Sequence, residues 1–140
     1  MRNIVKMEFS AKLANVTFAR AAAAAFVLDL DLTINVINEI KTIVSEAVTN
    51  AIIHGYNQNE KKSVYLELYL EDNKLTIIVK DEGVGIPDIE KAREPLFTTK
   101  LQEERAGLGF TIMDIFSDEM EITSSVDEGT TVICTKILPI

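Results

Sequence analysis

The sequence predicts a two-layer domain of the α+β class, with one layer of β-sheet and one layer of helices. Several short segments alternate apolar and polar residues, which is typical of strands with one buried face. One long segment, Thr33 to Gly55, instead repeats apolar residues at helical spacing. The elements follow one another as strand, two helices, two strands, a glycine-bounded loop, a helix and two strands. This order favours two packed layers in one domain that spans residues 1–140.

The sequence pattern of the first quarter of the chain predicts one strand and one helix. The strand covers Ile4 to Ser10, where apolar residues alternate with charged ones, and we expect it to open the sheet or lie at its edge. A helix follows from about Asn15 to Leu28, and its run of alanines favours helix intrinsically. The residues Asp29 to Leu32 interrupt the pattern, and Thr33 is a suitable N-cap for the next helix.

The long predicted helix carries Glu46, Asn50 and His54 at four-residue steps, so these three side chains lie along one side. Glu46 and Asn50 fall at the edge of the apolar stripe, not on the opposite, solvated face. We therefore expect a carboxylate and an amide where the core meets a cleft. Gly55 suits a left-handed cap at the end of the helix. Taken alone, the pattern favours an ordinary amphipathic helix with polar residues beside its apolar stripe.

The rest of the chain predicts two antiparallel hairpins separated by an irregular segment. The four strands cover Ser63 to Leu70, Lys74 to Lys80, Glu119 to Val126 and Thr130 to Leu138. Between the hairpins, Asp88 to Arg93 is expected to form one or two helical turns, and Phe110 to Phe116 a short helix. The intervening residues Glu94 to Ala106 show little periodicity, which indicates a mobile segment.

The composition limits the classes of partner. The formal net charge of −8 argues against a nucleic-acid backbone as the main partner, because binding it requires clustered Lys and Arg. No apolar run approaches the roughly 20 residues that span a bilayer, and the first residues lack a hydrophobic signal segment. Cys134 is the single cysteine, which excludes an internal disulfide and favours the cytosol. We expect it to be a small buried residue of a strand.

Four polar sites recur where predicted elements end. They are Glu46 with Asn50, Asp81-x-Gly83-x-Gly85, Gly107-x-Gly109, and Gly129-Thr130. Each alone fits ordinary structure, since glycine pairs and Asp after a strand are usually turn formers. Their order along the chain is more informative than any one of them.

In this order and context the four sites resemble the GHKL superfamily of ATP-binding domains, over most of the chain. The resemblance implies a Bergerat-type fold, with a mixed, mostly antiparallel sheet covered by helices on one face. It also implies that Asn50 holds a Mg²⁺ ion that bridges the phosphates of ATP or ADP, since this hard cation suits amide and phosphate oxygens. Asp81 would accept a hydrogen bond from the adenine amino group, and Gly83 and Gly85 would let the backbone approach the base.

The same resemblance assigns the remaining nucleotide contacts. Gly107 and Gly109, at the start of a helix, would present free N–H groups to phosphate oxygens, and Thr130 would support adenine directly or through water. The segment from Glu94 to Ala106 corresponds to a lid over ATP. The further residues expected at the nucleotide are His54, Thr98, Thr99, Lys100, Arg105, Leu108 and Phe110.

Within the superfamily, the segments 46–56, 81–90 and 95–100 resemble the anti-sigma factor kinases of endospore-forming bacteria. The resemblance implies a cytoplasmic homodimer that uses Mg-ATP, sequesters a sporulation sigma factor of the sigma F type, and phosphorylates an anti-anti-sigma factor on serine. Glu46 would be the general base toward the serine hydroxyl, and Arg20 would contact the protein partners. On its own, Arg20 fits a solvated helix charge equally well.

We also consider other classes of protein. An anti-sigma kinase of the general stress type would use the same chemistry on other partners. The ATPase half of a histidine kinase requires a phosphoacceptor histidine upstream, whereas the single histidine, His54, lies inside the asparagine motif. A module that only binds nucleotide is disfavoured by Glu46, and the gyrase and chaperone ATPases need further domains.

Overall fold

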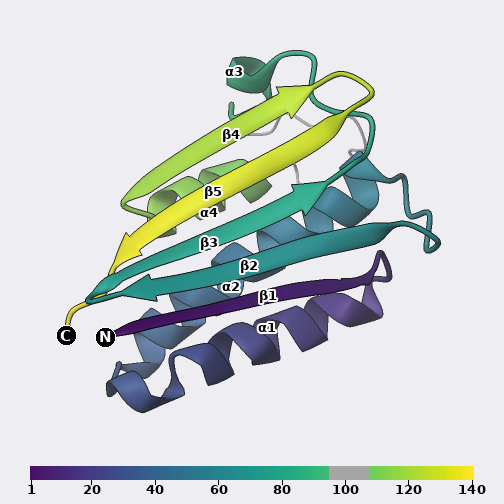
Figure 1. Cartoon of the computed structure of the whole chain (residues 1–140). Helices are drawn as coiled ribbons and strands as arrows, with labels where there is room; N and C mark the ends of the chain where they lie inside the picture. Colours follow the sequence, from purple (N-terminus) through teal and green to yellow (C-terminus); the bar gives the residue numbers. More distant parts are fainter. Residues whose placement is uncertain (95–107) are drawn as a thin grey trace.

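A five-stranded sheet forms one layer of the molecule, and helices cover one of its faces (Figure 1). The computed structural model describes residues 1–94 and 108–140. The strands are β1 (Arg2–Ser10), β2 (Ser63–Glu71), β3 (Lys74–Asp81), β4 (Glu119–Ser125) and β5 (Gly129–Ile137). Their order across the sheet is β1-β2-β3-β5-β4, so the first strand lies at an edge, as its pattern predicts. Both predicted hairpins, β2–β3 and β4–β5, are present.

Every strand pairing within the described residues is antiparallel, so the expectation of a mixed sheet is wrong in that detail. The chain leaves β3 and returns as β4, which runs in the same direction as β3. The following strand, β5, lies between them and pairs with both β3 and β4. The crossover therefore creates no parallel neighbours.

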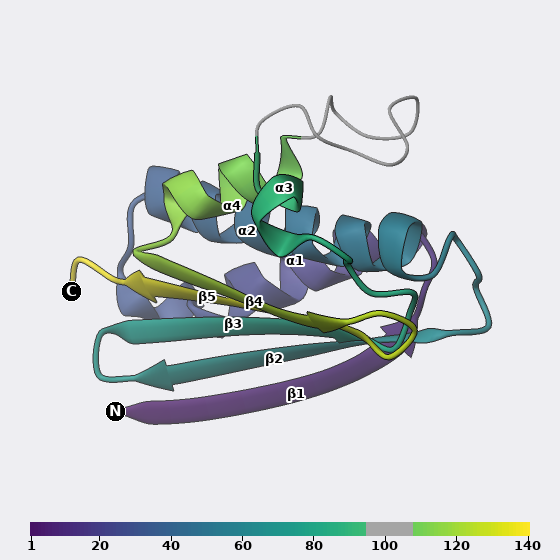
Figure 2. The same ribbon diagram turned by 90° about the horizontal axis from the view of Figure 1, so that it is seen from above.

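The helical layer is centred on one long helix. The helices are α1 (Ala14–Phe26), α2 (Ile34–Asn50), α3 (Ile89–Ala92) and α4 (Gly109–Phe116), with a 3₁₀ turn at Leu28–Leu30. Figure 2 shows α1, α2 and α4 above the same face of the sheet. Both α1 and α4 pack against α2. Thr33 caps α2 as predicted, because its hydroxyl accepts a hydrogen bond from the Val36 N–H at 3.3 Å.

The core lies between α2 and the covered face of the sheet. On α2 it includes Ile40, Ile43, Val44 and Val48, and on the sheet Leu66, Leu68, Leu75, Ile77 and Val79. The sheet residues follow the period-two alternation of the sequence, while their neighbours face solvent. Cys134 belongs to this core and is 1% exposed, as expected.

The end of α2 differs from the prediction. Gly55 does not adopt the left-handed conformation of a cap, because α2 continues into a π-helical turn, Ala51–Gly55, closed by the Tyr56 N–H on the Ala51 carbonyl at 3.0 Å. Glycine is required here for space. A Cβ on Gly55 would lie 2.7 Å from atoms of the Asp81 carboxyl group.

Of the connection between β3 and β4, the structure describes residues 82–94 and 108–118. The predicted helical turns after Asp88 form α3, which Asp88 caps by accepting from the Lys91 N–H at 3.1 Å. The predicted lid lies almost entirely outside the described residues, together with Thr98, Thr99, Lys100, Arg105 and Gly107. Within residues 1–94 and 108–140, no helix is long and apolar enough to cross a membrane.

Candidate functional site

A cavity of about 840 Å³ lies between the end of α2, the ends of β3 and β5, and the first residues of α4. It brings together sequence-predicted residues that are far apart along the chain. Seven of these line it, namely Asn50, His54, Asp81, Gly85, Gly109, Phe110 and Thr130. Apolar side chains, among them Val79, Ile86 and Val132, form much of the remaining wall. A cavity with an apolar wall and a few convergent polar groups is the usual form of a small-molecule site.

Asp81 is the buried acidic group among the three aspartates that line this cavity. It is the last residue of β3, pairs with Thr130 of β5, and is 9% exposed. Its Oδ1 atom accepts a hydrogen bond from the Gly83 N–H at 2.9 Å. Burial raises the pKa of Asp81 to about 6, while the backbone N–H groups of Gly83 and Thr130 act in the opposite direction. The carboxyl group is thus fixed and poorly solvated, and it can accept a hydrogen bond from a ligand.

The loop after Asp81 depends on its glycines. Gly85 has a φ of +78°, which favours glycine, and a Cβ there would lie 2.3 Å from the Ser125 carbonyl oxygen. A Cβ on Gly83 would lie 1.9 Å from the Gly55 carbonyl oxygen. The Gly55 carbonyl also accepts from the Val84 N–H at 3.0 Å. The contacts of Gly83 and Val84 with Gly55 hold the loop against the π-helical turn that follows α2.

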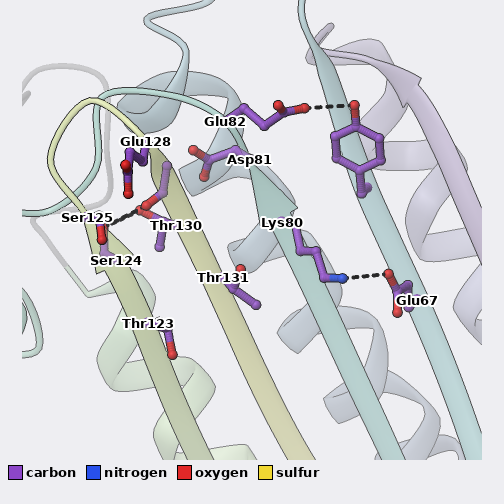
Figure 3. A pocket seen from close by; sticks show the side chains of 12 residues that line it. Glu67, Lys80, Asp81, Glu82, Thr123, Ser124, Ser125, Glu128, Thr130 and Thr131 are labelled. Carbon is purple, nitrogen blue, oxygen red and sulfur yellow. Dashed lines mark hydrogen bonds and ion pairs between the residues drawn. The ribbon is translucent and has the colours of Figure 1, made fainter.

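Thr130 is oriented by Ser124, a residue that the sequence analysis missed (Figure 3). The Ser124 hydroxyl accepts from the Ile86 N–H at 2.7 Å, donates to the Gly129 carbonyl at 3.0 Å, and lies 2.9 Å from the Thr130 hydroxyl. Because the Ser124 proton is engaged with Gly129, Thr130 donates in the last bond. Its oxygen lone pairs therefore remain for a ligand. Ser124 follows Met120 and Ile122 at period two, so a polar residue in this inward series was the available signal.

The structure buries Glu46 more deeply than the predicted position at the edge of a cleft. Glu46 is 2% exposed and is not among the lining residues of the cavity, whereas Asn50 and His54 line it and are half-buried. The reason is that α2 is packed by the sheet, α1 and α4 together. All residues from Ile43 to Val48 are consequently buried.

Asn50 fits the role of a metal ligand that shares the ion with a nucleotide. Its amide oxygen can take one position of Mg²⁺, an ion that usually keeps water and substrate phosphates as its other ligands. Among the described residues, no cluster of three His, Cys, Asp or Glu side chains that could hold a metal is found. At the start of α4, Gly109 and Phe110 line the cavity, and first-turn N–H groups favour anions.

Besides Glu46, three predicted residues of the described chain do not line this cavity. Gly83 lies in the loop but turns its backbone toward Gly55, and Leu108 is the N-cap residue of α4. Arg20 is half-buried on α1, a helix that contributes no lining residue within the described part of the chain.

A second hollow, of about 460 Å³, lies on the face of the sheet that the helices leave uncovered (Figure 3). Three of its charged side chains, Glu67, Lys80 and Glu82, pair with neighbours on the same face. The Lys80 ammonium lies 2.9 Å from a Glu67 oxygen, and the Tyr65 hydroxyl donates to Glu82 at 2.9 Å. Asp81 and Thr130 border both hollows. The other predicted residues line only the larger cavity, so we take that cavity as the functional site; they are Asn50, His54, Gly85, Gly109 and Phe110.

Comparison with known proteins identifies the class of this domain. Residues 9–136 match the family model of the histidine kinase-like ATPase domain. The anti-sigma F factor of Geobacillus kaustophilus strain HTA426 is 56% identical over 132 residues, which cover 94% of this chain and 90% of that protein. The anti-sigma F factor of Bacillus subtilis strain 168 is 52% identical over 138 residues, 99% and 94% of the two chains. The chain therefore belongs to the histidine kinase-like ATPase family and, within it, to the anti-sigma F factor family.

Two solved structures have the same fold. One contains the RsbU and RsbW domains of a Mycobacterium tuberculosis protein; its TM-score is 0.68 at 18% identity, and the match covers 97% of this chain but 32% of that one. The other is the catalytic domain of the histidine kinase ThkA, with a TM-score of 0.61 at 18% identity and 96% of both chains covered. At this identity the two matches establish the fold alone.

Proposed function

We propose that this protein is an anti-sigma factor and an ATP-dependent protein serine kinase. It binds a sporulation sigma factor of the sigma F type, keeps it from RNA polymerase, and phosphorylates an anti-anti-sigma factor on serine. The observation that carries the proposal is that Asn50 on α2 and Asp81 at the end of β3 line one cavity. The names of relatives that are 52–56% identical support the sigma factor as partner.

The nucleotide would lie with its base toward β3 and β5 and its phosphates toward α2 and α4. Asp81 would accept from the adenine amino group, Thr130 would support the base, and the apolar wall would cover its faces. Asn50 would hold Mg²⁺, which neutralises phosphate charge during transfer. The backbone around Gly109 would bind phosphate oxygens. His54, Leu108, Phe110 and the predicted residues of segment 95–107, which are Thr98, Thr99, Lys100, Arg105 and Gly107, would complete the site.

Glu46 would be the general base toward the acceptor serine. It lies one helical turn before Asn50 on the same side of α2, so it is close to the residue that would hold the metal. A positioned base typically contributes roughly 10²–10⁴-fold to proton transfer. Because Glu46 is buried, its side chain meets the acceptor only if that serine enters the site.

The partner surface is proposed at α1, where Arg20 would contact both the sigma factor and the anti-anti-sigma factor. The protein would act as a homodimer in the cytoplasm, where RNA polymerase works. An anti-sigma kinase of the general stress type remains the alternative, since it would use the same nucleotide chemistry. Binding assays with both kinds of sigma factor separate the two.

The proposal is tested by removing Glu46 while measuring three activities. Glu46→Ala and the isosteric Glu46→Gln are mixed with Mg-ATP, the sigma factor and the anti-anti-sigma factor. We expect phosphoserine formation to fall by roughly 10²-fold or more. Mg-ATP affinity and capture of the sigma factor should persist, because capture needs ATP bound and not consumed.

Normal phosphorylation by either folded variant would contradict a catalytic role for Glu46. The residue would then be only a polar side chain of a packed helix. Absence of any sigma factor capture by the wild-type protein with Mg-ATP would instead contradict the anti-sigma function.

A further inference from the structure

Tyr56 ties three separate segments of the site together through one hydroxyl group. The residue follows the π-helical turn at the end of α2 and is 6% exposed. Its hydroxyl donates to the Ser63 carbonyl at 2.7 Å and accepts from the Glu82 N–H at 2.6 Å. Both partners are backbone atoms. The end of α2, the start of β2 and the loop after β3 therefore meet at this single oxygen.

The backbone that Tyr56 holds is the peptide between Asp81 and Glu82. The same peptide is packed against Gly129, where a Cβ would lie 2.1 Å from the Asp81 carbonyl oxygen and 2.8 Å from the Glu82 Cα. The Glu82 side chain is held separately, by the Tyr65 hydroxyl at 2.9 Å (Figure 3). Packing thus limits where this peptide lies, and the Tyr56 hydroxyl supplies the hydrogen bond that sets its orientation.

The orientation of this peptide matters because the Asp81 carboxyl group is attached to it. The carboxyl group has one oxygen engaged with the Gly83 N–H, two residues further along the same loop. A rotation of the Asp81–Glu82 peptide would move both the carboxyl group and its internal donor. The direction in which the carboxyl group accepts a ligand hydrogen is therefore coupled to the Tyr56 hydroxyl.

We infer that Tyr56 is a positioning residue for adenine recognition. The Tyr56 hydroxyl orients the Asp81–Glu82 peptide so that Asp81 selects a purine that carries an amino donor. The inference rests on the proposed function, in which Asp81 receives the adenine amino group. Phenylalanine would keep the ring and its packing but would leave the Glu82 N–H without its acceptor. The loop would then lose part of its preorganisation and its selectivity.

The test compares ATP with ITP, whose base carries an oxygen in place of the amino group. Affinities of the full chain for both nucleotides are measured by calorimetry with magnesium, for the wild type and for Tyr56→Phe. We expect the wild type to prefer ATP. We expect Tyr56→Phe to reduce the ratio of ATP to ITP affinity roughly three- to tenfold, mainly by weakening ATP.

Tyr69→Phe is the matched control. It removes a tyrosine hydroxyl of β2 that donates to Glu67 at 2.6 Å. Tyr69 lines neither hollow. The ratio of ATP to ITP affinity of this variant should therefore equal that of the wild type. Hydrogen exchange at the Glu82 amide is a second readout that needs no ligand. It should accelerate in Tyr56→Phe and not in Tyr69→Phe.

The outcomes separate the inference from the proposed function. A wild type that prefers ATP, with an unchanged ratio and unchanged Glu82 exchange in Tyr56→Phe, would overturn the positioning role alone. An equal loss of ATP and ITP affinity would also overturn it, because that is the result of a purely structural role. A wild type that binds ATP and ITP equally would overturn the assignment of Asp81, and this inference with it.

Discussion

At the scale of single residues, the burial of Asp81, the proposed acceptor for adenine, carries a cost to the fold. Its folded pKa of about 6 lies above the ordinary value of 3.8, because burial disfavours the charged form. Between these two values the folded protein binds the proton and the unfolded chain does not. The stability contributed by this group is therefore fully present below pH 3.8 and is lost as the pH rises through 6.

We therefore expect Asp81→Asn to stabilise the nucleotide-free protein at neutral pH while it weakens ATP binding. Asparagine keeps an oxygen for the Gly83 N–H but carries no charge. The free energy of unfolding of the variant, relative to wild type, should rise between pH 4 and pH 7, by an amount on the order of 2–3 kcal/mol. Urea denaturation at both pH values measures this, and a difference that does not change with pH would contradict the assigned burial cost.

At the scale of elements, two basic side chains from outside α4 contact this helix, one by a hydrogen bond to its last carbonyl and one by an ion pair. Lys136 of β5 donates to the Phe116 carbonyl at the end of α4 at 2.7 Å and lies 3.2 Å from Glu39 of α2. Its side chain is 12% exposed. Arg93, next to α3, reaches Asp114 of α4 at 3.4 Å, but both of these side chains are well exposed. Removing one partner of a buried contact costs more than removing an exposed pair.

We expect Lys136→Met to lower the free energy of unfolding by about 1–3 kcal/mol, because the Phe116 carbonyl and Glu39 lose a shared partner. Asp114→Ala, the matched change at the exposed pair, should cost less than about 1 kcal/mol. The shift of the urea midpoint at constant slope measures both. Equal shifts would mean that the end of α4 does not depend on Lys136.

At the scale of the whole molecule, nucleotide and protein partners are assigned to different parts of the helical layer. The cavity lies at the end of α2 and the start of α4, whereas α1 packs on the other side of α2 (Figure 1). Arg20 of α1 is half-buried and no residue of α1 lines the cavity in the described chain. A change on α1 can therefore alter docking without touching the nucleotide.

We expect Arg20→Glu to weaken binding of both the sigma factor and the anti-anti-sigma factor by at least tenfold, as loss and reversal of an interface arginine commonly does. Affinity for Mg-ATP should stay within twofold. Lys74→Glu, the same charge reversal at an exposed position where β3 begins, is the control. Unchanged capture of the sigma factor by folded Arg20→Glu would return this residue to the role of a solvated helix charge.

The sequence by itself determined the features that depend on local pattern. Alternation placed all five strands, including the two that form the β2–β3 hairpin. Thr33 marked the start of α2 because N-cap chemistry needs only the next few residues. Resemblance to a known family selected Asn50, Asp81 and Thr130, and the structure brings these three to one cavity.

Only the tertiary structure decided what depends on contacts between distant segments. The position of β5 between β3 and β4 makes all pairings of the described strands antiparallel, and packing on three sides buries Glu46. The approach of Asp81, and not a helix cap, accounts for Gly55. The hydroxyls of Tyr56 and Ser124 could not be assigned to the site from the sequence, because the N–H groups of Glu82 and Ile86 that donate to them lie 26 and 38 residues away. Periodicity reports which face of an element is buried, but a hydrogen bond between segments exists only once the chain has brought them together.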